Sequence, residues 1–366
     1  MKVICDRGAL VDALNLTAAV VVNRSPKPVL TCVKLSATEG SLAIAATDLE
    51  VALRLSTPRV EVSEPGDAVI PADKFAQIVR ESVDSTITLE ADDEAAHIRG
   101  QDSHFKILTM PAGDFPPVPV FDGDADFEVE AGQLQKLLTQ TLFATARENS
   151  RYAINGVLIE RQAGKLTVVA TDGRRLALAK GTCQSKKSDN RSAIVPTKAL
   201  GLLIKLFDNP EETVRIRVAD NQILFAGEQA VVVSNLVEGS FPAYQDVIPR
   251  DGDRKATLDT ALLTSAVRRA SLLTNEESKG VKFSFSTKDL TLTSRAPEMG
   301  EAEVTMPVAR YDGEAIDIGF NPTFVVDVLK VVDSNQVTFE FKAPNKPGVL
   351  RTGPEFLYVV MPVSLQ

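Results

Sequence analysis

The sequence predicts an α+β fold in which one domain is repeated three times, each copy having two helices packed on antiparallel β-sheets. A strand–turn–strand pattern occurs around Thr47-Asp48 and again around Thr171-Asp172. The two lie 124 residues apart, which is the length of a domain and not of a solenoid unit. Prolines that open a predicted helix keep the same interval, at Pro71, Pro196 and Pro322. We therefore expect domains at residues 1–122, 123–252 and 253–366.

Within each copy the predicted order is helix, strands, helix, strands. Apolar residues at helical spacing predict helices at 9–23, around 75–79, at 133–146, from 196 to about 207, at 259–270 and from 321. The last of these begins with Asn321 as a cap and Pro322 in the first turn, a strong start signal. Alternating apolar stretches predict strands at 29–37, 42–55, 60–69, 85–90, 95–100, 104–110, 156–161, 166–180, 213–219, 222–226, 230–236, 281–286, 290–294, 301–306, 337–341, 348–352 and 356–361.

Composition is that of an ordinary globular protein, with 44% hydrophobic and 24% charged residues among 366. No run of about 18 apolar residues occurs, so we expect no membrane-spanning helix and no membrane partner. The N-terminus lacks the apolar core of a secretory signal. Three scattered cysteines form no pattern, which favours reduced thiols in a cytoplasmic protein.

The motifs of common enzymes are missing. The sequence has no phosphate-binding or dinucleotide-binding glycine motif and no Cys or His spacing typical of a metal site. Its two histidines, His97 and His104, fall in predicted strands of one copy, where a structural role is the simpler interpretation. We therefore expect no enzymatic activity, no cofactor and no metal.

Basic residues gather on the predicted helices, although the net charge of the chain is −9. They outnumber the acids there, whereas most acidic residues fall in strands and turns; the basic set is Arg7, Arg24, Lys74, Arg80, Lys136, Arg147, Lys198, Lys205, Arg268, Arg269 and Lys330. A repeated helical layer with this bias indicates a polyanion facing the helices, contacted through its phosphates. If two such chains join head to tail, the helices line the inside of a ring.

Several short motifs carry a resemblance to a known family. They are Thr47-Asp48-Leu49-Glu50, Arg151-Tyr152-Ala153-Ile154-Asn155-Gly156, Thr171-Asp172-Gly173-Arg174-Arg175-Leu176, Phe241-Pro242-x-Tyr244 and the tail Tyr358-Val359-Val360-Met361-Pro362-Val363. Together with the three-copy order, they make the whole chain resemble the bacterial sliding clamp, the beta subunit of the replicative DNA polymerase.

The resemblance implies DNA-clamp-type domains, three of which form half of a ring that a head-to-tail homodimer completes. It implies a processivity factor with no enzymatic activity, which slides on duplex DNA without sequence specificity. The implied partners are the replicative DNA polymerase, the clamp loader complex, and repair and translesion polymerases. Each would insert a short peptide into a pocket between the second and third domains.

Carried over residue by residue, the resemblance assigns three sets of positions. The partner peptide pocket comprises Ile154, Thr171, Gly173, Arg174, Arg175, Leu176, Pro242, Val247, Phe324, Val359, Val360, Met361, Pro362 and Val363. DNA-binding residues are Arg24, Lys74, Arg151, Tyr152 and Lys198. The dimer interface comprises Lys74, Phe75, Ile78, Phe105, Ile107, Leu272 and Leu273.

Two other functions remain open from the residues alone. One is a repeat-built scaffold that binds peptides without encircling DNA, and the other is an enzyme that uses scattered carboxylates between copies. Relatives often carry a basic residue where Asp246 stands, a Tyr in place of Phe324, and an Arg-Leu end in place of Leu365-Gln366, which bears on partner preference. Only the middle copy combines Gly173, Arg174 and Arg175 with a neighbouring free tail, so we expect one groove per chain.

Overall fold

The computed structural model describes residues 1–57, 59–146, 153–185, 187, 189–274 and 280–364. These residues form two compact units, the first from Met1–Gln135 and Cys183–Leu236, the second from Lys136–Thr182 and Val237–Gln366. The α-helices of the described residues are α1 (Arg7–Thr17), α2 (Ala72–Glu81), α3 (Ala131–Thr141), α4 (Thr197–Leu206), α5 (Thr260–Ala270) and α6 (Pro322–Leu329). Short 3-10 turns are η1 (Pro28–Thr31), η2 (Ala112–Asp114), η3 (Leu142–Ala144), η4 (Tyr244–Val247) and η5 (Ser271–Leu273).

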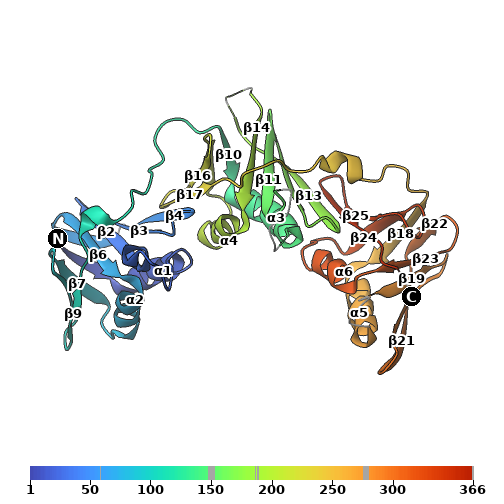
Figure 1. Ribbon diagram of the computed structural model, residues 1–366, viewed down its shortest axis with the longest axis horizontal. Helices are drawn as coiled ribbons and strands as arrows, with labels where there is room; N and C mark the ends of the chain where they lie inside the picture. The colour runs from blue at the N-terminus through green and yellow to red at the C-terminus, as the bar shows by residue number, and fades with distance from the viewer. Residues whose placement is uncertain (58, 147–152, 186, 188, 275–279, 365–366) are drawn as a thin grey trace. The chain divides into compact units, whose positions relative to one another are not determined.

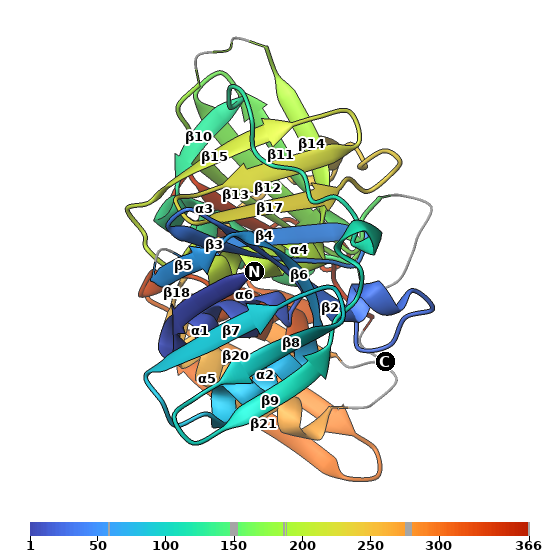
Figure 2. The same ribbon diagram turned by 90° about the vertical axis from the view of Figure 1, so that its left-hand side faces the viewer.

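The first unit contains two antiparallel sheets. One runs in the order β5 (Val60–Glu64), β1 (Lys2–Asp6), β7 (Thr86–Ala91), β8 (Ala95–Arg99) and β9 (His104–Leu108), and Figure 2 shows its last three strands side by side. The other runs β10 (Phe127–Glu130), β15 (Thr213–Val218), β16 (Gln222–Ala226), β17 (Ala230–Asn235), β4 (Val51–Thr57), β3 (Ser41–Thr47), β2 (Cys32–Thr38) and β6 (Gly66–Pro71). Helices α1 and α2 pack against each other in this unit, and β14 (Arg191–Pro196) leads into α4 (Figure 1).

The second unit repeats this plan. One sheet contains the run β11 (Gly156–Gln162), β12 (Lys165–Thr171), β13 (Arg175–Thr182), β26 (Phe356–Val360), β25 (Gly348–Thr352), β24 (Gln336–Phe341), β18 (Arg254–Asp259) and β22 (Arg310–Asp312). The other runs β21 (Gly300–Pro307), β20 (Asp289–Ala296), β19 (Val281–Phe285) and β23 (Ile316–Phe320). Helices α5 and α6 pack against each other, as α1 and α2 do.

Strand pairing between consecutive copies explains why three predicted copies give two compact units. Strand β4 of the first copy pairs with β17 of the second, and β13 of the second pairs with β26 of the third. The middle copy therefore contributes one half of its strands to each neighbour's sheet. The predicted boundaries at 122 and 252 stay a prediction, because the compact units divide the middle copy instead.

The helix starts follow from local sequence. Asp6, Asp259 and Asn321 each accept a hydrogen bond from a backbone N–H in the first turn of α1, α5 and α6. Pro71 and Pro196 directly precede α2 and α4, as predicted. The first helix is shorter than predicted: it ends at Thr17, where the backbone N–H of Ala18 returns to Leu14 O, so that 18–23 lie outside it.

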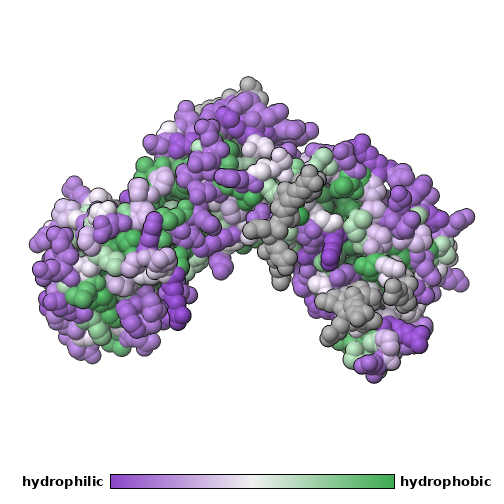
Figure 3. Space-filling model, in the orientation of Figure 1, coloured by the Kyte–Doolittle hydropathy of each residue, from purple (hydrophilic) through white to green (hydrophobic). Residues whose placement is uncertain are grey.

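The sheets enclose the core. In the second unit five aromatic rings pack together between its two sheets, those of Phe283, Phe285, Phe320, Phe339 and Phe341. Each is almost fully buried, and burying a side chain of this size contributes about 1.5–3 kcal/mol. The face drawn in Figure 3 is mostly hydrophilic, with apolar side chains in separate patches. No helix of the described residues is both long and apolar enough to span a membrane.

Candidate functional site

The two Thr-Asp turns of the sequence fold alike. In the first, Thr47 Oγ1 accepts from Leu49 N at 3.0 Å and Asp48 Oδ1 accepts from Val51 N at 2.7 Å. In the second, Thr171 Oγ1 accepts from Gly173 N and Asp172 Oδ1 from Arg175 N, at 3.1 and 3.0 Å. The third residue of each turn has a positive φ, 78° at Leu49 and 84° at Gly173. Glycine adopts this conformation without steric cost, so the second turn is the less strained of the two.

The chain's C-terminal strand lies beside this second turn. Strand β26 pairs with β13 so that Leu176 is opposite Val359, and Met361 N donates to Arg174 O at 2.9 Å. On its other edge β26 pairs with β25, and all five of its residues are buried. The tail therefore serves both as a core strand of the third copy and as a wall beside the second.

A small apolar cavity opens where these elements meet. Its volume is about 280 Å³, and it is lined by Ile154, Thr171, Gly173, Arg174, Arg175, Leu176, Pro242, Tyr244, Val247, Val359 and Met361. Leu176 and Val359 are buried walls, whereas Val247 and Met361 are 55% and 44% exposed at the mouth. Apolar side chains left exposed around a hollow suit the apolar side chains of a peptide.

Four residues predicted for the pocket do not line this cavity. Val360 follows Val359 on a strand, so its side chain points to the opposite face and is buried there. Pro362 and Val363 continue past the mouth, where Val363 N donates to Gly319 O at 2.9 Å. Phe324 lies under the Arg175 guanidinium, 4.4 Å from ring centroid to Cζ. Tyr244 lines the cavity and was missed, although its motif Phe241-Pro242-x-Tyr244 was recognised.

Arg175 is held inside the protein and does not point into solvent. Its Nη1 donates to Asp327 Oδ2 at 2.9 Å, its Nη2 to Phe143 O at 2.9 Å and its Nε to Asp172 Oδ2 at 3.1 Å. Burial alone would lower the pKa of the guanidinium, but Tyr358, Asp327 and Asp172 outweigh it and raise that pKa. Arg175 therefore fixes the Thr171–Leu176 turn against α6 of the third copy.

Arg174 has the opposite environment. It is exposed, and among the described residues no carboxylate lies within ion-pair distance of its guanidinium. Of the two arginines, Arg174 is the one available to a polar or acidic group of a bound peptide.

Replacing Arg175 by methionine is expected to lower the melting temperature by several degrees, because Asp327, Asp172 and Phe143 O lose a partner and a paired buried charge is broken. Differential scanning calorimetry measures the change. Arg174→Met is the matched control and should leave the melting temperature unchanged. Equal melting temperatures for the two variants would contradict the structural role of Arg175.

The predicted DNA-binding residues that the structure describes lie on separate segments of the first unit. Arg24 is exposed in the segment after α1, Lys74 is exposed on α2 and hydrogen-bonds to Gln77, and Lys198 on α4 forms an ion pair with Asp48. Arg151 and Tyr152 lie outside the described residues. Arg7, counted among the helical basic residues, instead donates to Val79 O and Arg80 O at the end of α2, so it acts as a C-terminal cap.

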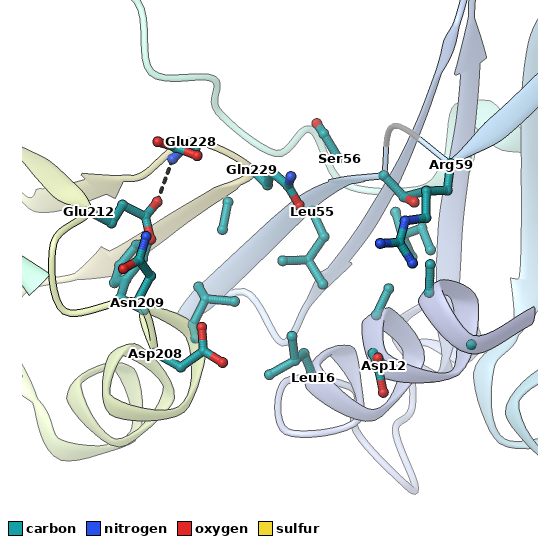
Figure 4. A pocket seen from close by; sticks show the side chains of 18 of the residues that line it. Asp12, Leu16, Leu55, Ser56, Arg59, Asp208, Asn209, Glu212, Glu228 and Gln229 are labelled. Atoms are coloured by element: carbon teal, nitrogen blue, oxygen red, sulfur yellow. Dashed lines mark hydrogen bonds between the residues drawn. The ribbon is translucent and has the colours of Figure 1, made fainter. Parts of the chain in front are cut away.

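A second, larger cleft of about 580 Å³ lies in the first unit between α1 and the end of α4. Figure 4 shows Asp12, Asp208, Glu212 and Glu228 around it, with Arg59 on one wall and the Glu228 backbone donating to the Glu212 carboxylate. Its surplus of carboxylates disfavours phosphate groups, so DNA is not expected in this cleft.

The predicted interface residues include one error. Phe75 is 0% exposed in the core beneath α2, because its position on the helix faces the sheets, and it cannot offer surface to a second chain. Ile78, Ile107 and Leu273 are half-buried, while Phe105 and Leu272 are 41% and 76% exposed. Strands β9 and β21 each end the order of their sheet, so each has an edge that pairs with no other strand of the described residues, next to these side chains.

Family models of the DNA polymerase III beta subunit match the chain three times: the N-terminal domain at residues 1–119, the central domain at 128–243 and the C-terminal domain at 245–364. The chain belongs to the DNA polymerase III beta subunit family. Its three clamp domains, mixed helices and antiparallel sheets are those of this family, and the α+β prediction is confirmed.

Curated relatives of the beta subunit family match over the full length. The beta sliding clamps of Pseudomonas putida and Chlamydia pneumoniae are both 34% identical, over 98% of each chain for the first and over 100% and 99% for the second. Among solved structures, the Pseudomonas aeruginosa beta subunit is 33% identical with a TM-score of 0.94, and the Bacillus subtilis sliding clamp is 25% identical with a TM-score of 0.96. Both comparisons cover 100% of each chain. One P. aeruginosa clamp structure, with a TM-score of 0.95, is bound to griselimycin.

These likenesses make this member of the beta subunit family a processivity factor of DNA replication, an accessory subunit of DNA polymerase. The clamp fold implies that it encircles duplex DNA.

Proposed function

We propose that two copies of this chain close head to tail around duplex DNA and that DNA polymerases are held on the ring through the apolar cavity beside β26. The cavity and Arg174 in its lining support this most directly, because they offer a short peptide apolar subsites and a guanidinium that no carboxylate of the described residues pairs with. The proposed peptide pocket therefore comprises the cavity residues, with Phe324 and Arg175 as supports.

The wider set of partners belongs to the same proposal. The clamp loader and the repair and translesion polymerases would use this cavity in turn, in the cytoplasm, and the chain itself would carry out no catalytic step. Griselimycin, which a P. aeruginosa clamp binds, is proposed to occupy the same cavity here. The division into domains 1–122, 123–252 and 253–366 is proposed on the three family matches, whose ends fall near these boundaries.

The homodimer is proposed to join the β9 edge of one protomer to the β21 edge of its partner. Support comes from the exposed side chains next to each edge, Phe105 beside one and Leu272 beside the other. A scaffold that binds peptides without encircling DNA would need no such closure.

Reversing the charge of Arg24 and Lys198 together, by R24E/K198E, is expected to weaken retention on DNA and to flatten its salt dependence. Each lost phosphate contact reduces the slope of log affinity against log salt by about one. Binding to a duplex oligonucleotide is measured over a range of salt. The matched control is K288E/K346E, which reverses two exposed lysines with no carboxylate in ion-pair distance among the described residues. An unchanged slope for R24E/K198E would show that these residues do not face DNA.

A further inference from the structure

We propose that the peptide pocket continues into a second, basic groove that binds an acidic segment next to the pocket-bound part of the same partner peptide. This extension rests on the pocket proposed above. We call it the flank groove, and its defining residues are Glu160, Lys165, Lys180, Gln245, Ile248 and Arg250.

The flank groove lies on the sheet formed by β11, β12 and β13, under the segment that follows Phe241-Pro242. Its volume is about 570 Å³, roughly twice that of the cavity. Leu178 forms a buried apolar floor, and Lys165 of β12 and Lys180 of β13 lie on the same face of the sheet, at the rim. An apolar floor with a charged rim accepts an extended peptide and orients it.

Tyr244 joins the two hollows, because it lines both. The tyrosine is 7% exposed and its hydroxyl donates to Glu160 Oε2 at 2.6 Å. Burial raises the pKa of Tyr244, so the hydroxyl keeps its proton and its hydrogen bond. The turn η4 then presents Val247 to the cavity and Gln245 to the groove, so a peptide leaving the cavity past Tyr244 enters the groove.

The charged residues around the flank groove indicate what kind of peptide binds there. Lys165, Lys180 and Arg250 are all exposed, and among the described residues no carboxylate lies within ion-pair distance of any of them. Two acids also line the groove: Glu160, whose Oε2 is engaged by Tyr244, and Glu355 at the opposite rim. The three basic residues outnumber these two acids, which favours a peptide with acidic side chains. A nucleic acid is disfavoured because the groove has a buried apolar floor and shares Tyr244 with an apolar cavity.

The test uses fluorescein-labelled peptides in fluorescence anisotropy. The core peptide is Gly-Leu-Leu-Phe, whose binding in the cavity is verified by displacement with griselimycin. Two longer peptides carry Asp-Glu-Asp-Glu on its N-terminal or C-terminal side, and two neutral peptides carry Asn-Gln-Asn-Gln instead. The chain is compared with K165E/K180E and with the matched control K288E/K346E.

One of the acidic peptides is expected to bind the chain about fivefold more tightly than its neutral counterpart, since exposed charge pairs each contribute little. The K165E/K180E variant should lose this difference and bind the core peptide unchanged, and the control should keep it. Equal affinities of the acidic and neutral peptides would contradict the proposed role of the flank groove. An affinity difference that persists in K165E/K180E would contradict it as well.

If the proposed pocket itself is wrong, the core peptide gives a different result. A core peptide that does not bind the chain, or that griselimycin does not displace, contradicts the proposed pocket and with it the extension. A duplex oligonucleotide forms the last arm of the test. If K165E/K180E weakens duplex binding and leaves all the peptide affinities unchanged, the groove serves nucleic acid and the proposal is wrong.

Discussion

Replacing Val247 and Met361 together by aspartate is expected to weaken griselimycin binding at least about a hundredfold. Both side chains stand half-exposed at the mouth of the cavity, so a ligand that fills it must bury them. Each loses about 1.5–3 kcal/mol of apolar burial, and each carboxylate is desolvated by the ligand. Isothermal titration calorimetry measures the affinity, and primer extension with the replicative polymerase should give short products.

Because Val247 and Met361 are exposed, the double variant tests ligand binding separately from folding. Neither side chain is part of the core, so the variant should keep the melting temperature of the parent chain. Val120→Asp is the matched control, since it places the same charge on a similarly exposed apolar residue that does not line the cavity. Unchanged griselimycin affinity in V247D/M361D would show that the ligand binds elsewhere and would remove the support for the pocket.

Replacing Phe105 and Leu272 together by aspartate is expected to convert a dimer into a monomer. In a head-to-tail ring each variant chain places one new carboxylate in both of its interfaces, and two large apolar contacts are lost at each. Light scattering should then give 39.4 kDa, where the parent chain should give twice that mass. The monomeric variant should also no longer be retained on circular DNA.

Leu262→Asp is the control for this second experiment. Leu262 is exposed on α5, close in sequence to Leu272, yet outside the candidate interface. It should leave the dimer intact. A dimer that persists in F105D/L272D would show that the β9 and β21 edges do not meet in the assembly.

The repeated turns could be predicted from sequence because their chemistry is local. A Thr-Asp pair satisfies the backbone N–H groups that follow it, and Gly173 supplies the positive φ without help from the rest of the chain. The same holds for Asn321 and Pro322 at the start of α6. Such features depend on only a few neighbouring residues, so they can be predicted from a single sequence.

The environment of Arg175 could not be predicted, because Asp327 comes from a helix 152 residues further along the chain. Adjacent arginines look alike in sequence, yet Arg175 is mostly buried and hydrogen-bonded, whereas Arg174 is exposed and has no carboxylate of the described residues within ion-pair distance. Phe75 was misassigned because it shares the apolar face of α2 with Ile78 and Val79, and only the packing of that face shows that Phe75 is fully buried while Ile78 stays half-buried. The pairing of β4 with β17 likewise depends on long-range contacts.

Encirclement is tested most directly by loading the dimer onto a closed circular plasmid with a clamp loader and ATP, then cutting the circle once. The protein is expected to stay on the intact circle, and to leave within minutes of linearisation, unless bulky protein blocks are attached to both ends. Retention on linear DNA with free ends would contradict a ring that slides, and would favour a scaffold held by ordinary surface contacts.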